Sequence, residues 1–196
     1  MRNKLLELDQ VFLDTETTGL DPEKDEIIEI AIIRRSYKGD ITNTFCRMVK
    51  PSNTEKALES SKINGYSPEA WSGSHPFSVI SSQVADLLKN CVIYGHNIRF
   101  DMDFILGEMK GCDTKHNISH HTMDTRVLAY EYLVPRGLES LSLKSILQFY
   151  GIDTTGSHSA LVDARNCMMV HDRIMKDHPA KKHRSLMESI KGWITL

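Results

Sequence analysis

The sequence has no long hydrophobic run and little cysteine. None of its apolar stretches approaches the roughly 20 residues that a membrane-spanning helix needs, so we expect no membrane partner. Near the N-terminus, Glu7 and Asp9 follow the apolar pair Leu5 and Leu6 directly, so we expect no signal peptide. The four cysteines include no CxxC pair, which favours reduced thiols in a cytoplasmic protein over a disulfide framework.

Net charge is also nearly absent. The 24 Lys and Arg residues against 26 Asp and Glu residues leave a formal charge of −2, which neither favours nor excludes a nucleic-acid partner. A chain with this balance would need local basic patches or bound cations to hold a polyanion. The 196 residues, 40% of them hydrophobic, suit one globular domain and exclude disordered and fibrous classes.

The pattern of apolar residues predicts an α/β fold. Strands are expected at 10–13, 27–33, 41–49 and 91–94, with a further short strand or turn at 122–124. Helices are expected at 76–88, 98–110, 125–133, 141–150 and 160–176. Three consecutive antiparallel strands, followed by strands that alternate with helices, predict a mixed sheet flanked by helices.

Two acidic residues follow the first predicted strand. Asp14 and Glu16 are two positions apart, so in extended chain their side chains point to the same face. A hard divalent cation such as Mg²⁺, which takes oxygen ligands, would relieve the repulsion between them. A solvated strand end that serves the following turn is the alternative, and this short pattern alone does not decide between the two.

A second group of polar residues lies where the helix at 98–110 begins. Asp101 and Asp103 point about 200° apart on a helix, so we expect Asp101 to face the end of the sheet and Asp103 to face solvent. Asn97 is placed to cap this helix. Phe100 and Phe104, four residues apart, favour a core position over base stacking.

A third group precedes and enters the last predicted helix. His158 and Asp163 converge if the histidine lies in the loop before the helix and the aspartate lies within it. Ser159 would then be the N-cap residue, and Gly156 would permit the sharp entry. Taken alone, a histidine near a helix start is more often a surface residue than a catalytic one.

The three segments together resemble a known family. DTETTGL from residue 14, GHNIRFDMDF from residue 95 and HSALVDA from residue 158, in this order, resemble the three motifs of the DnaQ-like 3′–5′ exonucleases. Within that DEDD superfamily they are most similar to the histidine-containing DEDDh branch. The likeness spans about Val11 to Met175. The segment KINGYSPEAW is also similar, although many members have histidine where Asn64 stands.

The resemblance implies a fold and a division of the chain. We expect a ribonuclease-H-like fold in which a five-stranded mixed sheet is flanked by helices. Residues 1–178 would form the DEDDh exonuclease domain. Residues 179–196 would form a basic C-terminal extension, helical and packed on or near that domain.

The resemblance also implies roles for individual residues. Asp14 would bridge two Mg²⁺ or Mn²⁺ ions, Glu16 and Asp163 would help to hold the first, and Asp101 would support the second. His158 would be the general base that deprotonates the attacking water. Substrate contacts would come from four further residues: Thr17, Leu20, Ile63 and Asn97.

Hydrolysis of a phosphodiester suits this set of groups. Two cations about 3.5–4 Å apart can hold the attacking and leaving oxygens, and an imidazole with a pKa near 6.5 suits proton removal at cellular pH. We expect the enzyme to release 5′-mononucleotides from 3′ ends of single-stranded DNA, and a role in DNA proofreading would require a separate polymerase partner chain. Trimming of RNA ends or short oligoribonucleotides is an alternative, because these motifs do not reveal a 2′-hydroxyl contact. A non-catalytic, polymerase-associated binding module is a third interpretation, against which the clustered acids argue.

Overall fold

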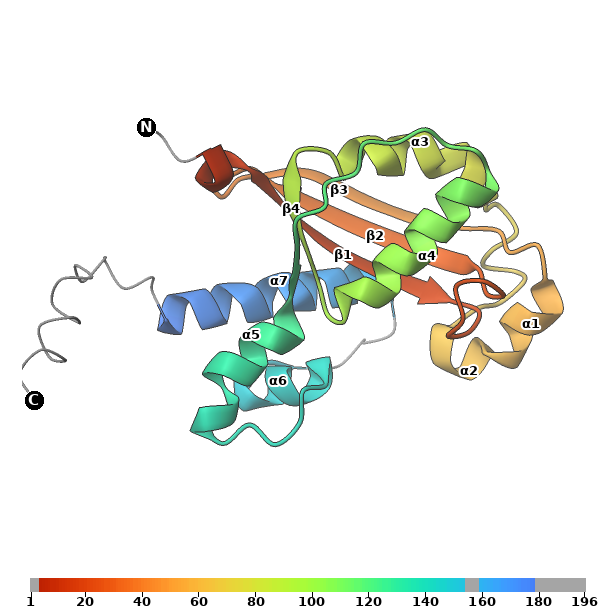
Figure 1. Ribbon diagram of the computed structural model, residues 1–196. Helices are drawn as coiled ribbons and strands as arrows, with labels where there is room; N and C mark the ends of the chain where they lie inside the picture. The colour runs from red at the N-terminus through yellow and green to blue at the C-terminus, as the bar shows by residue number, and fades with distance from the viewer. Residues whose placement is uncertain (1–3, 154–158, 179–196) are drawn as a thin grey trace, which may run out of the picture.

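A mixed β-sheet forms the middle of the molecule. The computed structural model describes residues 4–153 and 159–178, and their strands are β1 (Asp9–Thr17), β2 (Ile27–Arg35), β3 (Ile41–Met48), β4 (Cys91–Gly95) and β5 (Thr122–Asp124). These strands form one sheet in the order β3-β2-β1-β4-β5 (Figure 1). β2 is antiparallel to both of its neighbours, β1 and β3, whereas β4 and β5 run parallel to β1. The predicted α/β class and the five-stranded mixed sheet are therefore confirmed.

Helices pack against this sheet. In the described residues they are η1 (Lys4–Glu7), α1 (Thr54–Glu59), α2 (Ser61–Asn64), α3 (Phe77–Leu87), α4 (Ile98–Gly111), α5 (Thr125–Tyr132), η2 (Val134–Arg136), α6 (Leu143–Phe149) and α7 (Ala160–Asp177). The helices predicted at 76–88, 98–110 and 160–176 agree with α3, α4 and α7 to within one residue at each end. The apolar pattern does not predict α1 and α2, because each is too short to show a helical period.

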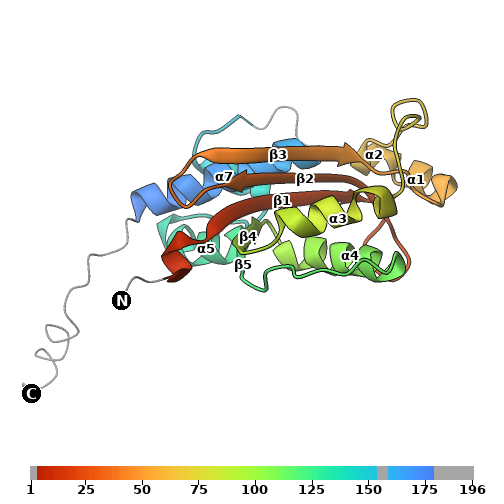
Figure 2. The same cartoon turned by 90° about the horizontal axis from the view of Figure 1, so that it is seen from above.

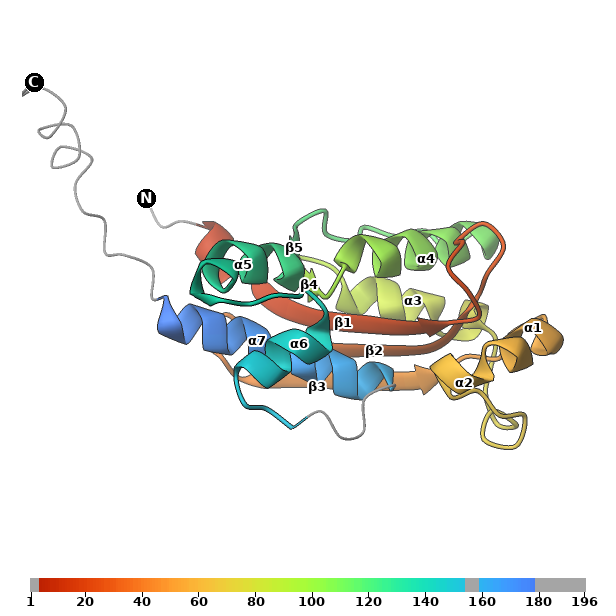
Figure 3. The same ribbon diagram turned by 90° about the horizontal axis from the view of Figure 1, so that it is seen from below.

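Alternation along β1 sends its side chains to two opposite layers. Leu13 packs in the cluster shared with α3 and α4, whereas Phe12 packs on the other face with Ala164 of α7. Figures 2 and 3 show α3 and α4 on one side of the strands and α7 on the other. Asp14 and Glu16 continue the series that begins with Phe12, so they lie on the face that α7 covers.

Two side chains of β2 hold α7 on this face. Arg35 donates from its two terminal nitrogens to the two carboxylate oxygens of Asp172, at 2.8 and 2.9 Å. At the other end of the helix, Glu29 Oε2 accepts a hydrogen bond from the backbone N–H of Ala160 at 3.1 Å. The first turn of α7 and a point near its last turn are therefore both attached to one central strand.

The contact between Asp172 and Arg35 makes the stability of the fold depend on pH. Burial acts to raise the pKa of Asp172, but hydrogen bonds with His171 and Arg35 outweigh it and lower the pKa to about 2. A lowered pKa stabilises the folded state above the unfolded pKa of about 3.9, and this contribution is lost as the pH falls through the folded value.

We therefore expect Asp172→Asn to lower the free energy of unfolding at neutral pH. The loss should be on the order of 1 kcal/mol, because solvent screens this half-exposed group. Urea unfolding of both proteins at a series of pH values measures it. The difference between them should shrink below about pH 4, where the carboxylate of the unfolded chain begins to protonate. A difference that stays constant down to the acid limit would contradict this electrostatic account.

The last part of β1 has one unpaired edge, because β1 is longer than β4. The two strands pair from Asp9 with Cys91 to Phe12 with Tyr94, after which the chain leaves β4 at Gly95 and enters α4. Beyond that point β1 still pairs with β2 on its other edge. The first strand also does not end where the apolar run ends: it continues through both acids to Thr17, so they are part of the strand and do not follow it. An open strand edge that carries acids is thus placed beside the start of α4.

No helix among the described residues is long and apolar enough to cross a membrane. The predicted basic extension, residues 179–196, lies outside the described residues.

Candidate active site

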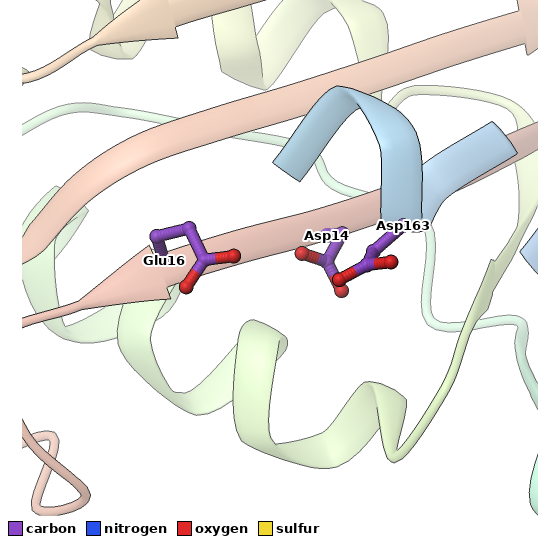
Figure 4. Close-up of side chains that lie close together, drawn as sticks. All are labelled: Asp14, Glu16 and Asp163. Atoms are coloured by element: carbon purple, nitrogen blue, oxygen red, sulfur yellow. The ribbon is translucent and has the colours of Figure 1, made fainter. Parts of the chain in front are cut away.

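Three of the four predicted metal-ligating acids meet at this end of the sheet. Carboxylate oxygens of Asp14, Glu16 and Asp163 all lie within 4.8 Å of one another. Asp14 and Glu16 share one face of β1, and Asp163 projects toward them from the first turn of α7. Figure 4 shows the carboxylates of Asp14 and Asp163 side by side, with that of Glu16 turned toward them. Residues about 150 positions apart in the sequence are therefore brought to one point.

Asp101 approaches the open edge of β1 from α4. Its Oδ1 accepts hydrogen bonds from the backbone N–H of Thr15 at 2.9 Å and from the Thr15 hydroxyl at 2.8 Å. The backbone donor is available because β4 ends before it can pair with this part of β1. Asp101 is 3% exposed. Asp103, two residues on, is exposed and pairs with Arg99, which confirms the prediction that it faces solvent.

Three carboxyl groups at this site have raised pKa values. Burial raises the pKa of Asp14 well above its ordinary value, and the charges of Asp101, Asp163 and Glu16 raise it further. Burial, followed by the charge of Asp163, raises the pKa of Glu16 to about 8. Burial likewise raises the pKa of Asp101 to about 7, although its hydrogen bonds from Thr15 oppose the shift.

Divalent cations fit this donor set. Carboxylate oxygens are the ligands that Mg²⁺ and Mn²⁺ prefer, and the three converging groups offer one such atom each. A bound dication would offset the repulsion that raises these pKa values. The arrangement of Asp14, Glu16 and Asp163 therefore suits a metal centre, with Asp101 held beside it by Thr15.

An apolar hollow opens beside Glu16. It has a volume of about 370 Å³, and its lining includes Thr17, Leu20, Ile63 and Phe100. Leu20 and Ile63 are 84% and 72% exposed, an unusual state for such large aliphatic side chains. The hollow thus holds three of the four residues predicted to contact substrate.

The two phenylalanines of α4 differ in position. Phe104 is buried in the core, as predicted. Phe100 is only partly buried, and it both packs against that core and lines the hollow. The prediction of a core residue is therefore incomplete for Phe100.

Asn64 fixes one wall of this hollow. Its Nδ2 donates to the carbonyl of Thr17 at 3.0 Å, and its Oδ1 accepts from the backbone N–H of Tyr66 at 3.0 Å. The side chain is 3% exposed. Because Asn64 ties α2 to the end of β1, it holds the neighbouring Ile63 in the lining of the hollow.

Asn97 lies in a different hollow. This second hollow has a volume of about 480 Å³ and is lined by His96, Asn97, Arg126 and residues 140–143. Asn97 occupies the N-cap position of α4, but its backbone is left-handed, with φ 71°, and its side chain does not cap the helix. Its Oδ1 accepts instead from Arg126 Nη1 at 3.0 Å. Asn97 is therefore the N-cap residue of α4, as predicted, although its side chain makes no capping hydrogen bond.

Glu29 is a residue near the site that we did not predict. It lies opposite Glu16 in the register of β1 and β2, and its charge acts on both Asp14 and Glu16. The sequence did contain a signal, because a single glutamate interrupts the apolar run IIEIAII. A buried carboxylate in such a run needs a partner.

His158, the predicted general base, lies outside the described residues, as does Gly156. Ser159 is the N-cap residue of α7, as predicted, although its side chain makes no capping hydrogen bond. The role of His158 stays a prediction from the sequence.

Comparisons with known proteins agree with this geometry. The family model RNase_T, described as Exonuclease, matches residues 11–171. DNA polymerase III subunit epsilon of Treponema pallidum is 31% identical over 167 residues, which cover 84% of this chain and 75% of that protein. The PolC-type DNA polymerase III of Thermotoga petrophila is 33% identical over 169 residues, but these cover only 12% of that longer protein.

Solved structures share the fold. Exonuclease I of E. coli, in complex with a dT13 oligonucleotide, matches with a TM-score of 0.72 at 19% identity, over 88% of this chain and 42% of that one. Cell-death related nuclease 4 (CRN-4) matches with a TM-score of 0.74 at 17% identity, over 90% of this chain and 67% of that one. These likenesses confirm the ribonuclease-H-like fold. The family match over residues 11–171 and the relative from Treponema pallidum show that the chain belongs to the exonuclease family and is a DnaQ-like 3′–5′ exonuclease.

Proposed function

We propose that this exonuclease degrades single-stranded DNA from the 3′ end, releases 5′-mononucleotides and uses two divalent metal ions. The observation that carries the proposal is the convergence of Asp14, Glu16 and Asp163 at the rim of an apolar hollow. Glu16 belongs to both features, so a nucleotide in the hollow has its phosphate near the carboxylates. The crystal structure of exonuclease I with dT13 supports DNA as the substrate of this fold.

Four carboxylates would hold the metal ions. Asp14, Glu16 and Asp163 would hold one ion, and Asp14 with Asp101 would support the other. When bound, the ions supply positive charge at the attacking and leaving oxygens of an in-line displacement. Thr15 restrains Asp101 through two hydrogen bonds, so that carboxylate is already oriented before substrate arrives.

The hollow would receive the 3′-terminal nucleotide. Leu20 and Ile63 form exposed apolar walls against which an unstacked base can lie, and Phe100 offers an aromatic surface. Such contacts are made to any base, so we expect little sequence preference. Thr17, at the end of β1, would contact the same nucleotide.

The second hollow would receive the part of the strand on the 5′ side of that nucleotide. The start of α4 carries Phe100 in the first hollow, Asp101 at the cluster and the N-cap residue Asn97 in the second hollow. A strand held by its 3′ nucleotide can therefore pass the carboxylates and continue along this turn. Asn97 and the guanidinium group of Arg126 are placed to donate hydrogen bonds to its backbone phosphates.

His158 would act as the general base and would place the enzyme in the DEDDh branch. In the sequence it precedes Ser159, the N-cap of α7, and Asp163 lies in the first turn of that helix. A neutral imidazole that takes a proton from the attacking water completes the set of groups that hydrolysis needs.

A polymerase partner is a further part of the proposal. The relative from Treponema pallidum is named as a subunit of DNA polymerase III, and the relative from Thermotoga petrophila carries the matching region within a polymerase chain. We infer that this chain also acts beside a separate polymerase.

Digestion of 5′-labelled oligonucleotides tests the function. Single-stranded DNA and RNA of one sequence are incubated in parallel with Mg²⁺, Mn²⁺ or a chelator. We expect a ladder that shortens from the 3′ end on DNA with either metal, and none with the chelator. Faster shortening of RNA would overturn the choice of DNA and favour the exoribonuclease alternative. Binding of DNA without cleavage in any metal would contradict the proposed reaction.

A further inference from the structure

Glu29 occupies a position where a carboxylate is unfavourable in itself. It is the third residue of β2 and is 8% exposed, and its neighbours in the strand are buried on both faces. Its register partner on β1 is Glu16, a second acid. A buried carboxylate next to other carboxylates costs folding free energy unless hydrogen bonds stabilise it. The hydrogen bonds of Glu29 therefore indicate what the residue does.

Those hydrogen bonds join β2 to the start of α7. Glu29 Oε2 accepts from the backbone N–H of Ala160, the first residue of the helix, at 3.1 Å. Glu29 Oε1 accepts from the thiol of Cys46 on β3 at 3.3 Å. The first N–H groups of a helix have no partner within it, and Ser159, at the N-cap position, supplies none from its side chain. Glu29 provides this cap from a strand 131 residues away.

We propose that Glu29 is a positioning residue for the metal centre, because its cap on Ala160 sets where the first turn of α7 lies against β1 and so where Asp163 meets Asp14 and Glu16. The inference rests on the proposed function, since it concerns the same site. The cap affects the position of Asp163 in particular, because Ala160 and Asp163 lie in the same helical turn.

The attachment of α7 through Asp172 cannot replace this one. Arg35 holds the helix through Asp172, which is 12 residues after Ala160 and therefore about 18 Å further along the axis. Ala160 and Ala164 belong to the same buried cluster as Phe12 and Ala31, and their small side chains make no hydrogen bond that would fix this end of the helix. The hydrogen bond of Glu29 fixes the position of the first turn.

Two substitutions of Glu29 separate its geometry from its charge. Glu29→Gln keeps an oxygen at the same reach, so it can still accept from Ala160 while it loses the charge. Glu29→Asp keeps the charge but is one methylene shorter, which withdraws the acceptor. Glu108→Ala is the matched control, because Glu108 also accepts a backbone N–H, from Ile27 at 3.2 Å, at the opposite end of α4 from Asp101.

We expect Glu29→Asp to weaken the metal centre and Glu29→Gln to preserve it. Outer residues that orient metal ligands typically contribute about 10–100-fold to affinity or activity, so Glu29→Asp should weaken Mn²⁺ binding and lower kcat within that range. KM for single-stranded DNA should stay within about threefold, because the hollows are untouched. Glu29→Gln and Glu108→Ala should both stay close to the unsubstituted enzyme in Mn²⁺ affinity and kcat.

Calorimetric titration with Mn²⁺ keeps this test independent of the proposed function. If the enzyme binds Mn²⁺ but cleaves no DNA, the proposed function fails, and the Mn²⁺ affinities of the variants still decide the role of Glu29. Unchanged Mn²⁺ affinity in Glu29→Asp would overturn the inference. An equal loss in Glu29→Gln and Glu29→Asp would also overturn it, because the charge and not the cap would then be responsible.

Discussion

Replacing Asp14 by asparagine is expected to remove nearly all exonuclease activity while the fold remains intact. Asp14 is one of the three carboxylates that converge, and the charges of Asp101, Asp163 and Glu16 all act on it. Cations in such a site contribute several kcal/mol to the transition state, and about 4 kcal/mol corresponds to a rate about 1,000-fold lower. Initial rates on labelled single-stranded DNA in saturating Mn²⁺ measure the loss.

Asp103→Asn is the matched control for this substitution. Asp103 lies on α4 two residues after Asp101, but it is exposed and pairs with Arg99. We expect its activity to stay within about twofold of the unsubstituted enzyme, because a surface ion pair contributes little. Circular dichroism and thermal unfolding should show that both variants fold. Turnover above about a tenth of the normal rate in Asp14→Asn would contradict the assignment of Asp14.

Replacing His158 by alanine is the second substitution with a large expected effect. A positioned general base contributes about 10²–10⁴-fold to a rate, so kcat should fall by that factor. The base acts in its neutral form. The rate of the unsubstituted enzyme should therefore rise as the pH increases through about 6.5 and then level, and this step should be missing in His158→Ala.

His116→Ala is the control for the histidine substitution, because His116 is exposed in the segment between α4 and β5. We expect it to leave both the rate and the pH profile unchanged. If His158→Ala keeps the same pH step at a lower rate, another group is the base, and His158 has a different role.

The local parts of the fold and site could be predicted because they depend on short-range periodicity. Alternation of side chains along β1 placed Asp14 and Glu16 on one face, and the helical angle separated Asp101 from Asp103. Both expectations concern neighbours in the sequence, which share one element. The order of the motifs then indicated which distant elements meet.

Long-range hydrogen bonds could not be predicted in this way. Glu29 contacts Ala160 across 131 residues, and Asn64 contacts Thr17 across 47, so no local pattern encodes either pair. The same reason explains why the side chain of Asn97, at the N-cap position of α4, makes no capping hydrogen bond and instead accepts one from Arg126 of α5. In each case a partner from another element determines what the side chain does.

The central claim is that Asp14, Glu16 and Asp163 form a cation site, and anomalous diffraction from crystals soaked in Mn²⁺ tests it most directly. We predict a strong anomalous peak between these three carboxylates, within about 2.5 Å of an oxygen from each. Three carboxylates that point away from one another, with no anomalous peak among them at millimolar Mn²⁺, would contradict it.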